Sequence, residues 1–273
     1  MDDLKFGIIQ GRLTQSPPGC LQWFPNESWE DEFESASQIG INFIELIADI
    51  SYNSRNPIWN DKGIDLIKKN SSKNNISIHT LCNDYIIDHS ILDSKVIEQN
   101  NKLLIQAKKL GIKKYILPFF NKSEINPGNA KNYLNCLREI ADIANDSQIE
   151  VLLETILDGK QLSELLEDIG HSNIKVVFDT GNRIAFGHNL SDDIEILGDK
   201  ITHIHIKDKN INNENVILGT GLVNFSDVFR SLEKIKYNKS YVFETTRGSN
   251  PLKTAIYNMQ VVNFFIENSK KNV

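Results

Sequence analysis

Four segments in the second half of the chain place an acidic or imidazole side chain directly after an apolar run. These side chains are Glu154, Asp179, His205 and Glu244. Such a group is costly to desolvate in a buried setting unless a cation or hydrogen bonds compensate it. Three carboxylates brought together also repel one another, which requires a positive charge between them. One histidine with three carboxylates suits Mn²⁺, Mg²⁺ or Co²⁺, and Zn²⁺ is also compatible.

Short β-branched or aromatic runs alternate with longer amphipathic segments along the whole chain. The short runs have the near-continuous hydrophobicity of parallel strands that helices cover on the outside. They predict strands at 5–9, 43–47, 76–81, 115–117, 150–154, 175–179, 202–206 and 240–244. The amphipathic segments predict helices at 28–39, 92–110, 129–144, 162–169, 192–197, 225–235 and 252–267.

Eight strand-then-helix units share 273 residues, or about 34 each, which is the size of one βα unit. The pattern predicts an α/β fold, a closed (β/α)₈ TIM barrel, as a single domain over residues 1–273. An open doubly wound sheet competes, but the Gly-x-Gly-x-x-Gly turn expected after its first strand is absent. Because the carboxyl ends of barrel strands meet on one rim, the four polar side chains would converge there. The alternative is four unrelated buried polar residues, each satisfied by its own hydrogen bonds.

Composition disfavours several classes of function. The formal net charge of −6 argues against a nucleic-acid binder that relies on a basic face. No apolar run approaches the roughly 18 residues of a membrane helix, so we expect no membrane partner. The acidic start of the chain is unlike a secretory signal, and three widely spaced cysteines fit reduced thiols. We therefore expect a cytoplasmic protein.

Several short strings resemble the xylose-isomerase-like barrel superfamily, and within it the sugar and sugar-phosphate isomerases and epimerases. They are Leu-Leu-Glu-Thr (152–155), Phe-Asp-Thr-Gly-Asn (178–182), His-Ile-His-Ile-Lys-Asp (203–208), Leu-Gly-Thr-Gly-Leu-Val-Asn-Phe (218–225) and Phe-Glu-Thr-Thr-Arg (243–247). The resemblance spans essentially the whole chain. It implies that Glu154, Asp179, His205 and Glu244 bind one divalent metal ion.

The resemblance also implies a reaction, either 1,2-isomerisation or 3-epimerisation of a small sugar or sugar phosphate through a cis-enediolate. A proton next to a carbonyl is weakly acidic, so a divalent ion must stabilise the developing oxyanion. In the epimerase relatives the two glutamate ligands form the acid/base pair, which makes Glu154 and Glu244 the catalytic residues here. If both work, one carbon is inverted; if one returns the proton to the adjacent carbon, isomerisation follows.

Five further residues are candidate substrate contacts. Arg12 and Arg247 would lie at the same rim, and a guanidinium matches phosphate geometry. Lys207 would bind a phosphate or carboxylate, or else form an ordinary surface ion pair. Asn182 stands where epimerase relatives often carry a substrate-binding histidine, and the alternative is a turn residue. His79, expected near the end of the third strand, would contact substrate or form part of the pocket wall.

Some features depart from the ketose 3-epimerases or leave alternatives open. Asp158-Gly-Lys160 stands where those enzymes carry a second glutamate. Glu45 would be a buried partner of Arg12 or His79. An inosose-type dehydratase on the same metal site, or a catalytically silent sugar-binding barrel, remains an alternative function. A DNA-repair endonuclease is disfavoured by the net charge and by too few strand-end histidines. The aromatic pair at 264–265 would either join a homo-oligomer interface or complete the core.

Overall fold

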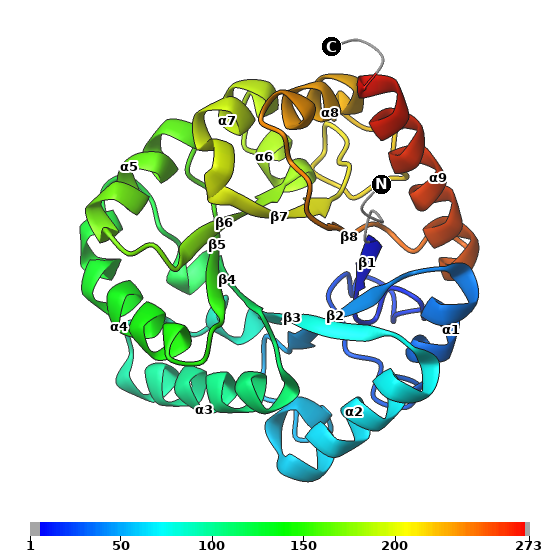
Figure 1. Ribbon diagram of the computed structural model, residues 1–273, viewed down its shortest axis with the longest axis horizontal. Helices are drawn as coiled ribbons and strands as arrows, with labels where there is room; N and C mark the ends of the chain where they lie inside the picture. The colour runs from blue at the N-terminus through cyan, green and yellow to red at the C-terminus, as the bar shows by residue number, and fades with distance from the viewer. Residues whose placement is uncertain (1–5, 271–273) are drawn as a thin grey trace.

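Eight parallel strands close into a barrel in the computed structural model, which describes residues 6–270 (Figure 1). Strands pair in chain order, and the first strand pairs with both the second and the eighth. The TIM-barrel prediction is confirmed, while residue 5 of the first predicted strand lies outside the described residues. The strands are β1 (Phe6–Ile9), β2 (Phe43–Ala48), β3 (Ser77–Asn83), β4 (Lys114–Phe119), β5 (Glu150–Thr155), β6 (Ile174–Asp179), β7 (Ile201–Ile206) and β8 (Tyr241–Phe243).

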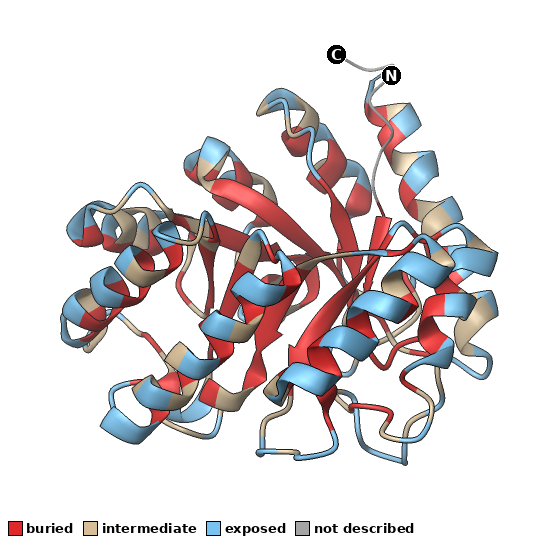
Figure 2. Ribbon diagram, turned by 60° about the horizontal axis from the view of Figure 1, so that its bottom comes forward, coloured by how far each residue is buried: buried red, intermediate tan, exposed pale blue. Residues whose placement is uncertain are grey.

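Helices surround the barrel and cover the outer faces of the strands (Figure 1). Buried residues concentrate in the strands and on the helix faces that point toward them, as Figure 2 shows. Within the described part of the chain, no helix is long and apolar enough to cross a membrane. The helices are α1 (Asp31–Ile39), α2 (Asp61–Asn74), α3 (Ser94–Leu110), α4 (Leu134–Asn145), α5 (Gly159–Ile169), α6 (Thr180–Ala185), α7 (Leu190–Leu197), α8 (Phe225–Lys234) and α9 (Pro251–Ser269).

The sequence patterns missed two helices, and they misplaced the starts of α1, α4 and α5 by three to five residues. Helix α2 escaped notice because it is mostly polar and has few apolar side chains, of which Ile64 and Ile67 are buried. Helix α6 is only six residues long and begins directly after β6. Helix α5 starts earlier than expected because Asp158 caps it. The Asp158 side chain accepts a hydrogen bond from Gln161 N, and the Gln161 side chain accepts one from Asp158 N. Asp158 is therefore a helix cap.

Strand β3 runs two residues further than predicted, to Asn83, which changes the place of His79. His79 lies in the first half of the strand, and its ring centroid is 4.2 Å from that of Phe43. The amino-terminal half of a barrel strand lies far from the rim that carries catalytic residues, because that rim is formed by the carboxyl ends of the strands. The expectation that His79 ends its strand is therefore wrong, and Asp84 follows the strand instead.

The aromatic pair on α9 divides between core and surface. Phe265 stacks against Phe229 of α8, with ring centroids 6.1 Å apart and ring planes nearly parallel. Phe264 keeps 60% of its surface exposed. Phe265 thus completes the packing between the last two helices.

Candidate metal and catalytic centre

The ends of β5, β6, β7 and β8 bring the four predicted ligand residues together. One ligand atom from each of Glu154, Asp179, His205 and Glu244 lies within 4.8 Å of the corresponding atoms of the other three. All four residues are buried, and their exposed fractions range from 1% to 6%. Parallel pairing explains the convergence, because Asp179 and His205 are register partners on neighbouring strands. The strand ends thus form one cluster on the carboxyl-terminal rim.

The imidazole of His205 faces all three carboxylates. Its Nδ1 lies 3.2 Å from Glu244 Oε2, 3.7 Å from Glu154 Oε2 and 3.9 Å from Asp179 Oδ2. Within residues 6–270, this Nδ1 is buried and makes no hydrogen bond. Buried polar atoms are almost always paired, so an unpaired nitrogen facing three carboxylates indicates a binding site for a cation. Three carboxylates and one imidazole nitrogen fit a divalent cation.

Lys207 supplies the positive charge that the carboxylates require in the metal-free protein. Its Nζ lies 2.8 Å from Glu244 Oε2 and 3.0 Å from Asp179 Oδ2, and only 4% of the side chain is exposed. The alternative of a surface ion pair is therefore wrong. Gly181 makes room for the lysine, because a Cβ there would approach the Lys207 stem to 2.6 Å. The ammonium is thus enclosed by the protein next to two ligand carboxylates.

The two glutamates of the cluster have opposite pKa shifts. Burial, followed by repulsion from Asp179, raises the pKa of Glu154 to about 8. Burial acts in the same direction on Glu244, but Lys207, His205 and Arg12 together hold its pKa well below the usual range. In the metal-free protein, the surroundings therefore favour the protonated form of Glu154 and the ionised form of Glu244. Two carboxyl groups whose pKa values are shifted in opposite directions are suited to separate acid and base roles.

Asn182 lies beside the cluster because α6 begins where β6 ends. Asp179 caps this helix, and its Oδ1 accepts a hydrogen bond of 2.6 Å from the Asn182 backbone. The Asn182 side chain donates to Glu154 Oε1 at 2.7 Å, and its own Oδ1 lies 3.4 Å from Lys207 Nζ. Asn182 is therefore more than a turn residue, because it contacts two members of the charged cluster.

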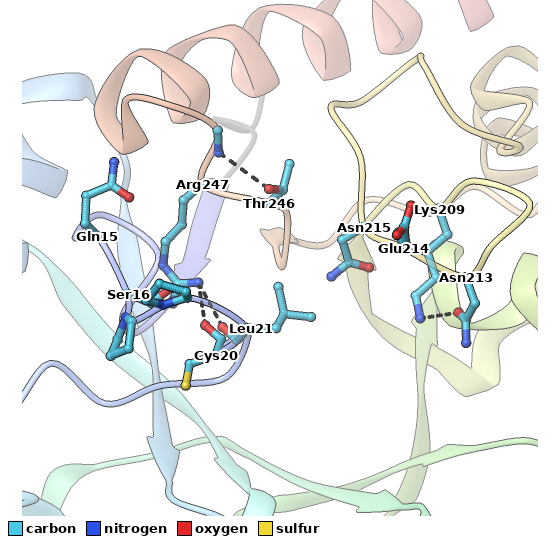
Figure 3. A pocket seen from close by; sticks show the side chains of 14 residues that line it. Gln15, Ser16, Cys20, Leu21, Lys209, Asn213, Glu214, Asn215, Thr246 and Arg247 are labelled. Carbon is cyan, nitrogen blue, oxygen red and sulfur yellow. Dashed lines mark hydrogen bonds between the residues drawn. The ribbon is translucent and has the colours of Figure 1, made fainter.

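Arg12 and Arg247 both donate hydrogen bonds to backbone carbonyls of the loop that follows β1. Arg247 Nε donates to Gly11 O at 2.8 Å, and Nη1 donates to Leu21 O at 2.9 Å (Figure 3). Arg12 also donates to Leu21 O, and its Nη2 lies 3.5 Å from Glu244 Oε1. Among the described residues, Nη2 of Arg247 is buried without a hydrogen-bond partner. The two guanidinium groups thus connect the loop to the acidic cluster.

Arg247 also lines a cavity of about 520 Å³ on the carboxyl-terminal side of the barrel. Figure 3 shows this cavity between the loops that follow β1, β7 and β8. Its walls are segments 15–21, 213–215 and 246–248, together with Lys209. The loops after the last two strands are a frequent phosphate-binding region of TIM barrels.

Glu45 has different partners from those expected. Its carboxylate oxygens lie 2.7 Å from His203 Nε2 and 2.8 Å from His205 Nε2, so its assignment to Arg12 or His79 is wrong. The sequence could have indicated that His203 and His205 share a partner, because alternate residues of a strand face the same side. The His-Ile-His string therefore directs both imidazoles into the barrel, where β2 presents Glu45.

A second cavity, of about 350 Å³, lies at the rim beside the loops after β1 and β2. Asp84 lines it and is 2% exposed; its Oδ1 accepts from the Cys82 thiol at 3.1 Å and its Oδ2 from Gln22 at 3.2 Å. Burial raises the pKa of Asp84 to about 7. The Asp84 carboxyl is thus poised to be neutral just below neutral pH.

The raised pKa of Asp84 predicts a pH-dependent contribution to stability. The folded protein holds the Asp84 proton more tightly than the unfolded chain, so stability is lost as pH rises from about 4 to about 7. The free energy of unfolding of wild type relative to Asp84→Asn should therefore fall by at most about 1.4 kcal/mol per pH unit. Urea unfolding of the metal-free proteins at a series of pH values measures this difference. A difference that stays constant with pH would contradict the shifted pKa.

The fold and the cluster together define the class as a TIM barrel with a candidate metal centre at the carboxyl ends of its strands. Residues 33–263 match the sequence profile of the family described as xylose isomerase-like TIM barrel, and the chain belongs to this family. The predicted superfamily is thereby confirmed.

Distant relatives of the chain are sugar 3-epimerases. It is 23% identical over 250 residues to a Mycoplasma pneumoniae protein named as a probable L-ribulose-5-phosphate 3-epimerase, with 85% of this chain and 81% of the relative covered. A solved structure of D-psicose 3-epimerase with D-tagatose from Clostridium cellulolyticum H10 superposes with a TM-score of 0.75 at 17% identity, covering 96% and 99% of the two chains. A xylose isomerase-like TIM barrel protein from Mycobacterium smegmatis in complex with magnesium gives 0.72 at 15% identity, covering 97% of each chain.

Proposed function

We propose that the protein is a divalent-metal-dependent sugar or sugar-phosphate isomerase or epimerase that moves a proton through a cis-enediolate. The observation that carries this proposal is the buried cluster in which His205 Nδ1 faces three carboxylates without a hydrogen-bond partner of its own. Mn²⁺, Mg²⁺ or Co²⁺ suits this donor set, and Zn²⁺ is compatible. When bound, the ion acts as a Lewis acid that stabilises negative charge developing on the substrate oxygen.

Glu154 and Glu244 are the proposed acid/base pair. Their opposite pKa shifts in the metal-free protein support a division of labour, in which the ionised Glu244 removes a proton next to the carbonyl. For epimerisation, the protonated Glu154 donates its own proton to the opposite face of the same carbon, whereas for isomerisation Glu244 returns the proton that it removed to the neighbouring carbon. The first route inverts one centre and the second moves the carbonyl.

Four residues around the pair are proposed substrate contacts. Lys207 and Asn182 stand beside the two glutamates, where a hydroxyl or an oxyanion of the substrate would reach them. Arg12 lies next to Glu244, and Arg247 lines the adjoining cavity with one buried nitrogen unpaired. Two guanidinium groups on this side favour a substrate with an anionic end, such as a phosphate. The three free cysteines fit the proposed cytoplasmic location.

Solvent deuterium incorporation tests the proposal directly. The protein is loaded with Mn²⁺ and incubated in deuterated water with a panel of ketoses and ketose phosphates. We expect deuterium at a carbon next to the carbonyl of at least one compound, and the position of the label separates epimerisation from isomerisation. A product lighter by one water would identify the dehydratase instead. Binding of a sugar without exchange at any carbon would identify a silent sugar-binding barrel.

A further inference from the structure

Glu45 and two histidines form a fully buried group behind the candidate metal centre, on the barrel side of His205. Glu45 and His203 are 0% exposed and His205 is 1% exposed. Each carboxylate oxygen of Glu45 serves one histidine, with Oε2 at 2.7 Å from His203 Nε2 and Oε1 at 2.8 Å from His205 Nε2. Glu45 therefore reaches His205 from the side opposite to the three carboxylates.

The two nitrogens of an imidazole have different tasks when one of them binds a metal ion. The ligating nitrogen must offer a lone pair, and the other nitrogen keeps its proton by donating it to a partner. In His205, Nε2 points at Glu45, while Nδ1 points at Glu154, Asp179 and Glu244. A carboxylate only accepts hydrogen bonds, so Glu45 requires that the proton stay on Nε2.

We propose that Glu45 is the positioning residue of the metal centre: it holds His205 with Nε2 protonated and Nδ1 free to bind the divalent ion. The proposal rests on the proposed metal-dependent function, and it adds a residue on β2 to a site otherwise built from β5 to β8. Partners of this kind orient ligand side chains, and their removal weakens metal binding.

His203 fixes the orientation of Glu45. The His203 ring lies at 76° to that of His205, with centroids 5.2 Å apart, so the two imidazoles approach Glu45 from different directions. Because each oxygen of Glu45 already has its own histidine, the carboxylate plane is set by two hydrogen bonds. The two distances between a histidine Nε2 and a Glu45 oxygen, 2.7 Å and 2.8 Å, are those of hydrogen bonds. The three residues therefore satisfy one another and do not need a second metal ion.

The decisive variant is Glu45→Gln, which keeps the shape but replaces one acceptor oxygen by an NH₂ donor. The amide can accept from only one of the two histidines, so the other must present an unprotonated Nε2. If that histidine is His205, its proton moves to Nδ1 and blocks the ligand position. If it is His203, the His205 Nε2 donates to a neutral amide instead of a carboxylate, which makes Nδ1 a weaker ligand. The matched variant His203→Gln replaces the other imidazole by an amide whose NH₂ can still donate to Glu45, and it leaves the bond to His205 in place.

The experiment titrates the metal-free full-length proteins with Mn²⁺ by calorimetry. We expect one ion per wild-type chain, an affinity about 10- to 100-fold weaker for Glu45→Gln, and an affinity within about threefold of wild type for His203→Gln. Equal losses in both variants would reduce Glu45 to a general packing role, and no loss in Glu45→Gln would overturn its positioning role while leaving the metal centre intact. Two ions per wild-type chain would place metal at Glu45 and overturn the proposal. Wild type that binds no Mn²⁺ would overturn the proposed function together with this inference.

A second measurement does not depend on the folding of Glu45→Gln. Long-range ¹⁵N–¹H correlation spectra of the wild-type protein loaded with diamagnetic Zn²⁺ report which nitrogen of each histidine carries the proton, and the His203→Gln spectrum assigns the signals. We expect His205 to carry its proton on Nε2. A proton on Nδ1 of His205 in the loaded protein would overturn the proposal.

Discussion

Glutamine in place of Glu244 is expected to lower turnover about 100- to 10,000-fold, because the amide cannot accept the proton that the carboxylate removes. Lys207, His205 and Arg12 keep the Glu244 carboxylate ionised, so the wild-type group is available as a base at neutral pH. The change should appear in kcat more than in KM, since the substrate contacts of the proposed site remain. Steady-state kinetics of the Mn²⁺-loaded proteins measure both constants.

Comparison with Glu154→Gln separates the two possible reactions. In a two-base epimerase each single variant should stop inversion but still exchange the proton on the face that the remaining glutamate serves. In an isomerase that uses one base, one variant should lose exchange entirely while the other keeps it. Glu150→Gln is the matched control for Glu154→Gln. Glu150 begins β5, the strand that carries Glu154, and lies at the opposite end of the barrel. Unchanged turnover in Glu244→Gln would remove Glu244 from the acid/base pair.

The four cluster residues could be predicted from the sequence because each follows an apolar run. A strand end is visible in a local pattern, and parallel strands bring such ends to one rim. The partner of Glu45 could not be assigned in the same way, since its hydrogen bonds to His203 and His205 span about 160 residues. Only the closed geometry of the barrel brings β2 and β7 face to face across the interior.

The place of Lys207 shows a second limit of sequence reasoning. A lysine one residue after a strand end is compatible with solvent, with substrate or with an ion pair, and the local pattern is the same in each case. The deciding facts are its 3% exposure, the absence of a side chain on Gly181, and the two carboxylates within 3.0 Å of its Nζ. These depend on packing between β6, β7 and β8, which no short string records.

Replacement of Lys207 by methionine should destabilise the metal-free protein by about 3 kcal/mol. The substitution keeps most of the apolar stem but leaves Asp179 and Glu244 buried with less compensation, and breaking a buried charge pair costs about that much. Urea unfolding in the presence of a chelator measures the loss. Lys234→Met is the control, because that lysine forms an exposed pair with Glu195 and should change stability by less than about 1 kcal/mol.

Divalent metal should reverse much of the loss in Lys207→Met. A bound cation neutralises the same carboxylates as the ammonium, so saturating Mn²⁺ should bring the variant closer to wild type in free energy of unfolding. A ligand that stabilises the variant more than the wild type must also bind the variant more tightly, because the two effects belong to one thermodynamic cycle. We therefore expect Mn²⁺ to bind Lys207→Met more tightly than wild type in calorimetry. If the loss of stability is the same with and without Mn²⁺, the ammonium and the metal ion neutralise different carboxylates, and the cluster around His205 is not the metal site.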